Sequence, residues 1–135
     1  MIGGARKRVL VVDDEAGVRE SIRILLSSEY EVLFATNGTE ALEIVERERP
    51  NLVLLDIIMP GMDGLEVCKR LKEHAATKDA PVLVMTAHDD LNRRIQAFDL
   101  GAADVVRKPF ELSELVARVR TQISIRTMTN ALQQQ

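Results

Sequence analysis

The fold of this chain is decided by one stretch of sequence, Leu52-Val53-Leu54-Leu55-Asp56-Ile57-Ile58-Met59-Pro60-Gly61-Met62-Asp63-Gly64. Its first four residues are apolar, with a Pro-Asn pair before them and a loop rich in proline and glycine after them. Such a run is typical of a strand buried on both faces, as in a parallel sheet covered by helices. The strand ends on Asp56. Ligands of open α/β sheets bind beyond the carboxyl ends of the strands, so Asp56 is a candidate functional residue and not only the start of a turn.

The composition of the chain sets the limits of its organisation. Its 135 residues, 46% of them hydrophobic, suit one domain with a full core and leave no room for a second. The formal net charge of -3 argues against direct nucleic-acid binding by this domain. A single cysteine, Cys68, excludes an internal disulfide and suits a reducing cytoplasm. We expect no signal peptide and no membrane span, because no apolar run is long enough.

Further strands and helices are expected on both sides of the opening stretch. Apolar runs predict strands at 9–12, 31–35, 80–86 and 104–106. Apolar residues at helical spacing predict helices through 18–26, 37–49, 65–74, 91–100 and 112–123. Asn37, three residues before Glu40, has the pattern of a helix N-cap, and Gly101 suits the left-handed conformation that ends a helix. The alternation predicts an α/β domain with a doubly wound, five-stranded, mainly parallel sheet and helices on both faces.

Polar side chains follow several of these strands at one edge of the predicted sheet. Asp13 and Asp14 follow the first strand and Asp56 the third, whereas Thr86 ends the fourth and Lys108 lies just past the fifth. Three neighbouring carboxylates disfavour being ionised together, and a divalent cation resolves that conflict. Oxygen ligands with room for water favour Mg²⁺. A hydroxyl and an ammonium beside the metal suit a phosphoryl group.

Asp56 is the candidate nucleophile of this site. A carboxylate beside Mg²⁺ can form an acyl phosphate. Pro60, Gly61 and Gly64 permit a tight turn directly after it. We therefore expect a carboxylate that solvent can reach.

Five motifs, in their order and spacing, resemble those of the chemotaxis-Y-like receiver domain of two-component response regulators. They are Asp13-Asp14, the stretch 56–64, Met85-Thr86-Ala87, Gly101-Ala102-Ala103-Asp104 and Lys108-Pro109-Phe110. The resemblance covers about residues 8–125, nearly the whole chain. It implies a flavodoxin-like fold with strand order 2-1-3-4-5.

The resemblance also implies a role for each acidic residue. Asp56 would accept a phosphoryl group from a sensor histidine kinase or a histidine phosphotransfer protein. Mg²⁺ would be held by Asp14, Asp56 and the backbone carbonyl of Ile58, with Asp13 acting mainly through water. Asp104 is expected to serve the turn before its strand and not the metal.

The resemblance further implies a switch. Thr86 would swing toward the phosphoryl group and Lys108 would pair with it, and the Lys108-Pro109 bond is expected to be cis. The negative charge that the phosphoryl group adds would favour one arrangement of the loops around the fourth and fifth strands. The output face would be formed by the helix at 91–100, the strand at 104–106 and the helix from 112. Its partners would be an output domain, an effector protein or a second copy in a homodimer.

Two residues near Thr86 bear on this switch. Family members often carry an aromatic residue at the position of Val105, which is β-branched and stiff here. We therefore expect a smaller output change, confined to the backbone of the loop after Thr86. His88, in that loop, is expected either to influence water access to the acyl phosphate or simply to be solvated.

The two ends of the chain are expected to lie outside the receiver domain at 8–125. Residues 1–7 form a flexible lead-in, and residues 126–135 form a helical extension, a linker or a frayed tail. Ile125, Met128 and Leu132 continue an apolar pattern there, which would allow the C-terminal helix to pair with another copy. A basic strip for a partner, or merely a solvated face, is expected from Arg93, Arg94, Arg118, Arg120 and Arg126.

The sequence thus predicts a phospho-accepting receiver module in the cytoplasm, a signalling switch that catalyses only its own phosphorylation and autodephosphorylation. Two alternatives remain open. An aspartyl-nucleophile phosphohydrolase would share the Asp, Thr, Lys and Mg²⁺, but it typically needs an acid–base Asp where this chain has Ile58. A phosphorylation-independent binding module of the same fold, such as a flavin binder, is disfavoured by one Tyr, no Trp and no glycine-rich loop after the first strand.

Overall fold

The computed structural model describes residues 6–59, 63–75, 77–87 and 89–133. The predictions for His88, for the Pro60-Gly61 turn and for residues 1–5 of the lead-in fall outside these ranges.

Strands and helices alternate along the described part of the chain. The strands are β1 (Arg8–Val12), β2 (Glu31–Ala35), β3 (Leu52–Asp56), β4 (Val82–Ala87) and β5 (Asp104–Lys108). The helices are α1 (Ala16–Leu26), α2 (Gly38–Glu48), α3 (Gly64–Glu73), α4 (Leu91–Asp99) and α5 (Leu112–Gln133). The strands form one parallel sheet in the order β2-β1-β3-β4-β5. The predicted fold class and strand order are confirmed.

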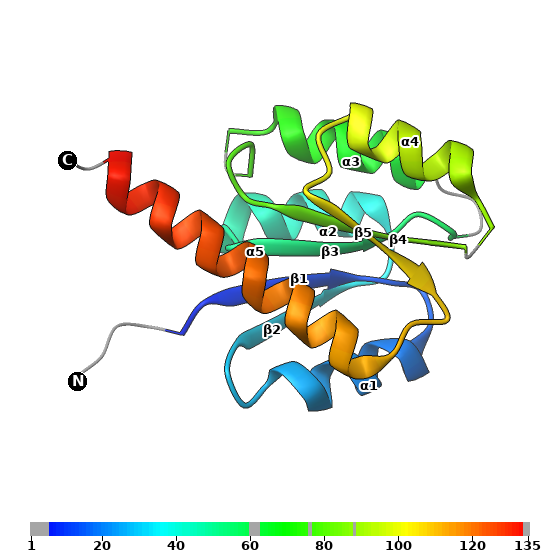
Figure 1. Ribbon diagram of the computed structural model, residues 1–135, viewed down its shortest axis with the longest axis horizontal. Helices are drawn as coiled ribbons and strands as arrows, with labels where there is room; N and C mark the ends of the chain where they lie inside the picture. Colours follow the sequence, from blue (N-terminus) through cyan, green and yellow to red (C-terminus); the bar gives the residue numbers. More distant parts are fainter. Residues whose placement is uncertain (1–5, 60–62, 76, 88, 134–135) are drawn as a thin grey trace.

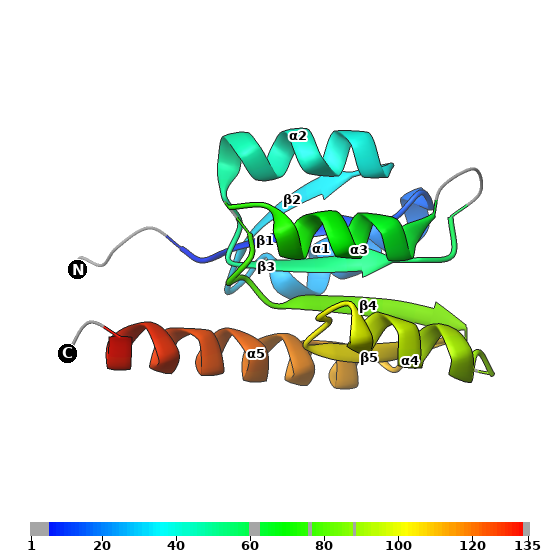
Figure 2. The same ribbon diagram turned by 90° about the horizontal axis from the view of Figure 1, so that it is seen from above.

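Helices cover both faces of the sheet, as Figures 1 and 2 show. Successive residues of β1 point to opposite faces, so Leu10 and Val12 pack with α2, α3 and α4. Val9 and Val11 pack on the other face with α1 and α5. Every residue of β3 is buried, which explains why its sequence is a continuous apolar run.

The predicted N-cap of α2 and the predicted glycine turn after α4 are confirmed. The Asn37 side chain accepts a hydrogen bond of 2.9 Å from the backbone N–H of Glu40. The Glu40 carboxylate in turn accepts from the N–H of Thr36, at 3.0 Å. After α4 the chain turns at Gly101, whose φ of +103° is a conformation that side-chain-bearing residues rarely adopt.

Helix α5 is longer than the apolar spacing up to Ile123 indicated, because it continues through Gln133. Its last apolar side chains are exposed, with Ile125 at 50%, Met128 at 65% and Leu132 at 69%. These turns extend beyond the sheet at the end of the molecule where β1 begins (Figure 1). None of the helices in the described ranges combines the length and the apolar character that crossing a bilayer requires.

Candidate functional site

The candidate site lies at the carboxyl edge of the sheet, where β1, β3, β4 and β5 end. Asp13 follows the last residue of β1, and Asp56 is the last residue of β3. Parallel pairing places Asp56 beside Met85 and Lys108 beside Ala87. Residues that are distant in sequence are therefore neighbours at this edge.

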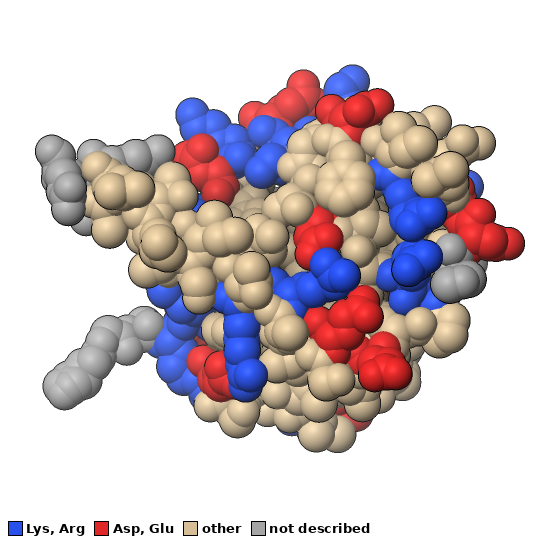
Figure 3. Space-filling view, viewed as in Figure 1, with Lys and Arg blue, Asp and Glu red and all other residues tan. Residues whose placement is uncertain are grey.

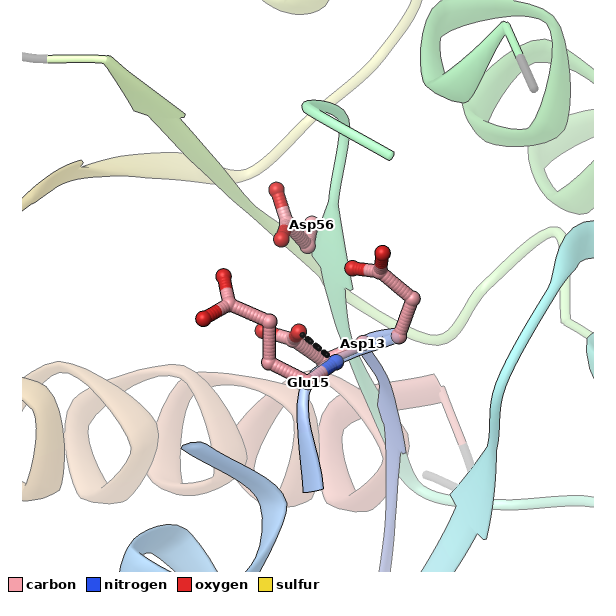
Figure 4. A group of neighbouring side chains, drawn as sticks. Asp13, Glu15 and Asp56 are labelled. Carbon is pink, nitrogen blue, oxygen red and sulfur yellow. Dashed lines mark hydrogen bonds between the residues drawn. The ribbon is translucent and has the colours of Figure 1, made fainter. Parts of the chain in front are cut away.

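Four carboxylates converge there. Asp13, Asp14, Glu15 and Asp56 each offer an oxygen, and these oxygens lie within 4.8 Å of one another. Figure 4 shows Asp13, Glu15 and Asp56 gathered around the ends of two strands. Asp13 and Asp56 are buried, whereas Asp14 and Glu15 are exposed. The cluster thus has a buried inner pair and an outer pair that solvent reaches.

Lys108 links the inner carboxylates. Its Nζ donates to Oδ2 of Asp56 at 2.8 Å and to Oδ2 of Asp13 at 3.1 Å. It also lies 3.9 Å from a carboxylate oxygen of Glu15. The Lys108-Pro109 peptide bond is cis, as predicted. One ammonium therefore offsets part of the negative charge of three acidic residues.

Backbone groups hold the inner carboxylates in place. Oδ1 of Asp13 accepts from the N–H of Glu15 at 2.9 Å, and Oδ1 of Asp56 accepts from the N–H of Ile58 at 2.8 Å. The Arg19 guanidinium donates to the backbone carbonyl of Asp13 at 2.7 Å. Each buried carboxylate thus has one oxygen bonded to the backbone and one bonded to Lys108.

Burial and the neighbouring charges shift the pKa values of Asp56 and Lys108 in opposite directions. Burial raises the pKa of Asp56, and the hydrogen bonds and charge from Lys108 and Ile58 offset only part of that rise. Burial alone would lower the pKa of Lys108, but the bonds and charges of Asp56 and Asp13 outweigh it and raise this pKa. Lys108 is therefore a stable cation at neutral pH.

The expectation that solvent reaches Asp56 is wrong. Its side chain is only 1% exposed. Lys108 and the N–H of Ile58 each occupy one of its two oxygens. A group that reacts with Asp56 must therefore first displace Lys108 or move the loop that follows β3.

Gly64 explains how this loop packs. A Cβ added to Gly64 would lie 2.3 Å from the Cα of Ile57, which no packing of real atoms allows. The start of α3 therefore lies directly against the residue that follows Asp56. The Asp63 carboxylate caps the helix there by accepting from the N–H of Leu65 at 3.0 Å.

The other predicted site residues lie near this cluster but do not all bond to it. Thr86 is buried near the end of β4, and among the described residues its hydroxyl donates to the carbonyl of Ala87, at 3.4 Å. Ile58 bonds to Asp56 through its N–H. Asp104 is not one of the four clustered acids, and its carboxylate accepts from Arg118 at 2.7 Å.

Glu15 is a site residue that was not predicted from the sequence. Its carboxylate belongs to the cluster and its N–H holds Asp13. The available signal was the run of three acidic residues, 13–15, after a buried strand.

The fold and the site together define a class: a flavodoxin-like α/β domain with an acidic cluster and a lysine at the carboxyl ends of its strands. The family model described as the response regulator receiver domain matches residues 9–120. The chain therefore belongs to the receiver domain family of two-component response regulators.

Curated relatives support this assignment. The chain is 49% identical over 114 residues to the response regulator MprA of Mycobacterium leprae, covering 84% of this chain and 49% of that protein. It is 48% identical over 114 residues to MprA of Mycolicibacterium vanbaalenii, covering 84% of this chain and 48% of the relative. The chain thus spans about half the length of the curated relatives it matches.

Solved structures show the same fold. A putative response regulator from Chloroflexus aurantiacus has a TM-score of 0.82 at 38% identity, covering 88% of this chain and 98% of that one. NtrX from Brucella abortus has a TM-score of 0.88 at 27% identity, covering 96% of this chain and 29% of its own. The chemotaxis protein CheY4 of Vibrio cholerae has a TM-score of 0.82 at 28% identity, covering 87% of this chain and 99% of that one.

Proposed function

We propose that Asp56 accepts a phosphoryl group from a sensor histidine kinase or a histidine phosphotransfer protein. The observation that carries the proposal is the contact of Lys108 with both buried carboxylates, Asp56 and Asp13. An ammonium fixed at this position is next to any phosphoryl group bonded to Asp56. The Lys108 ammonium can then hydrogen-bond to a phosphoryl oxygen in place of a carboxylate oxygen without leaving the site.

The chemistry follows from the carboxylate. An oxygen of Asp56 attacks the phosphorus of the donor, and a phosphorus–oxygen bond forms. The bond from phosphorus to the donor's ring nitrogen or acyl oxygen breaks, and the leaving group keeps its electron pair. Later attack of water on phosphorus releases phosphate and restores the carboxylate. The domain would thus catalyse only its own phosphorylation and dephosphorylation, as a signalling switch does.

The acidic cluster offers oxygen ligands of the kind that Mg²⁺ binds. Four carboxylate oxygens lie within 4.8 Å of one another and one ammonium only partly balances them, which suits a hard divalent cation. We propose that Asp13, Asp14, Asp56 and the backbone carbonyl of Ile58 hold it, with Glu15 at the rim. Bound there, Mg²⁺ would neutralise the charge of the incoming phosphoryl group.

Output would pass through α4, β5 and α5. Leu91, Ile95 and Phe98 follow one another at spacings of four and three on α4, and each is about half exposed at 56%, 49% and 50%. On the face seen in Figure 3, acidic and basic side chains are interspersed, and the end of α5 is mostly uncharged. This face would suit an output domain, an effector or a second copy, and it has no uniform field for nucleic acid.

Val105 gives this switch a feature of its own. It is half-buried and packs against the core cluster that includes Ala97 of α4. We expect it to limit the response to the backbone of the loop after Thr86. We also assign the receiver domain to residues 8–125, with 126–135 as a helical extension of that domain, a linker or a frayed tail, and place the protein in the cytoplasm.

The proposal is tested by incubating the chain with Mg²⁺ and a small acyl-phosphate donor and measuring its intact mass. We expect one added phosphoryl group per chain and none in Asp56→Asn, which keeps the shape of the side chain. Asp99→Asn is a matched control, because Asp99 ends α4 and lies outside the acidic cluster. Labelling that persists in Asp56→Asn, or that proceeds equally with a chelator present, would contradict the proposal.

A further inference from the structure

Two cations, Lys72 and Arg126, lie near the opposite end of the sheet, where α5 passes the loop between α3 and β4. A hollow of about 200 Å³ lies there. Its lining includes Lys72, Asp79, Gln122, Arg126 and Thr129. A water molecule takes up about 30 Å³, so the hollow has room for several groups of that size.

Arg126 is the unusual member of this lining. Its Nε and Nη1 are buried, and neither has a hydrogen-bond partner among the described residues. Buried donors without an acceptor are rare in folded proteins, and a bound water or ion is a common acceptor for them. The two nitrogens are therefore available to an acceptor that enters the hollow.

Lys72 adds a second charge at a fixed position. Its Nζ donates to the carbonyl of Ala80 at 3.1 Å, and its Cγ would lie 3.2 Å from a Cβ on Gly101. The glycine therefore lets the lysine stem lie close to the turn after α4. Burial lowers the pKa of Lys72, the charges of Cys68 and Asp79 offset part of that fall, and the charge of Arg126 adds to it. An anion between Lys72 and Arg126 would therefore add to the favourable charge that Asp79 supplies.

The neutral and acidic members of the lining narrow the choice of ligand. Gln122 offers amide donors and Thr129 a hydroxyl from the same helix as Arg126. The Asp79 side chain also lines the hollow, but no ion pair joins it to Lys72 or Arg126 in the described part of the chain. Two cations with extra donors suit an anion with several oxygens and more than one charge.

We propose that this hollow, formed by Lys72, Gln122, Arg126 and Thr129, binds a phosphate group, either as free phosphate or as a small phosphate monoester. The bound group would connect the end of α5 to α3. The site is independent of phosphoryl transfer to Asp56, which lies at the other end of the sheet.

The test is a titration of the ¹⁵N-labelled chain, with a chelator present and ionic strength held constant with sodium chloride. Inorganic phosphate and glycerol phosphate are added in separate arms while the Arg126 Nε–H signal and the Gln122 and Thr129 amides are followed. We expect these signals to shift together and to saturate. The arm that saturates at the lower concentration identifies the source of the phosphate group.

Variants separate a phosphate site from general attraction to a basic surface. Arg126→Gln should weaken binding about tenfold or more, the effect of losing a charge-assisted contact. Arg120→Gln removes the same charge from α5, but Arg120 is paired with Glu29, so we expect less than a twofold change. Asp79→Asn should tighten binding.

Several results would overturn the inference. If neither anion moves the Arg126 signal, water satisfies its donors. If Arg126→Gln and Arg120→Gln weaken binding equally, the attraction is nonspecific. If Asp79→Asn weakens binding or destabilises the chain, Asp79 is the partner of Arg126 in solution and no phosphate site is needed.

Discussion

Two lysines at opposite ends of the sheet show how partners decide what burial does to a charge. Lys108 lies between two buried carboxylates, and its pKa is raised. Lys72 donates to one backbone carbonyl and has no ion pair among the described residues; burial lowers its pKa, and the nearby charge of Asp79 offsets only part of this. The lysine at the carboxyl end of the sheet thus lies among several paired acids, and the lysine at the other end does not.

The largest expected effect compares a glycine at each end. Gly64→Ala places a Cβ 2.3 Å from backbone at the acidic site, so we expect it to lower the free energy of unfolding by about 3 kcal/mol. Gly101→Ala meets only the flexible Lys72 stem at 3.2 Å, although its φ of +103° is strained, so the loss should be about 1–2 kcal/mol. Urea denaturation measures both. Equal losses would show that the loop after Asp56 is not tightly packed.

The second prediction exchanges each lysine for methionine. Lys108→Met leaves Asp13 and Asp56 buried without a cation, so we expect a loss of about 2 kcal/mol in a chelator. Lys72→Met removes a cation that burial disfavours, so its effect should stay within about 0.5 kcal/mol. Denaturation midpoints give the comparison, and adding Mg²⁺ should recover part of the first loss. A larger loss of stability for Lys72→Met than for Lys108→Met would contradict this prediction.

The third prediction concerns pH at the acidic end. The folded pKa of Asp56 is raised, so folding is favoured by its protonated form, and that contribution is lost as pH rises through the raised pKa. Asp56→Asn, which cannot ionise, should therefore be more stable than the unchanged chain at pH 7. This difference should shrink as pH falls toward about 4, near the ordinary value for an aspartate. Denaturation across this pH range in a chelator measures it, and a difference that grows with acidity would contradict the expected sign.

The smallest expected effect comes from ionisation of the Cys68 thiol on α3. Burial raises the pKa of Cys68 to about 11, and the charge of Lys72 offsets little of this. Its thiol should therefore react slowly with iodoacetamide at pH 8 in the folded chain and quickly in urea. Because the folded pKa lies above the unfolded value, ionisation destabilises the fold as pH rises from about 9 toward 11. Cys68→Ala should remove that alkaline loss, and rapid alkylation of the folded chain would show that α3 opens readily.

The sequence was most informative where one physical rule acts alone. The run 52–55 identified β3 because a strand buried on both faces must be apolar at every position. Asp13, Asp56 and Lys108 could be placed together because parallel strands end at one edge. Asn37 and Gly101 identified helix ends by their own chemistry.

The sequence was least informative where contacts between distant residues decide the outcome. The burial of Asp56 depends on where Lys108 and Ile58 lie, and turn residues alone wrongly suggested an open carboxylate. Glu15 was missed because an exposed acid after an Asp pair has no distinctive local pattern. That two buried nitrogens of Arg126 have no partner among the described residues depends on how α5 packs beside the loop before β4.

The central claim is that Asp56, among the four clustered acids, is the residue that carries the phosphoryl group. The most direct measurement is to label the chain with an acyl-phosphate donor and Mg²⁺, reduce the acyl phosphate with borohydride and map the altered residue by peptide mass. We predict that the altered residue is Asp56 alone. Reduction at Asp13, Asp14 or Glu15, with Asp56 unchanged, would contradict it.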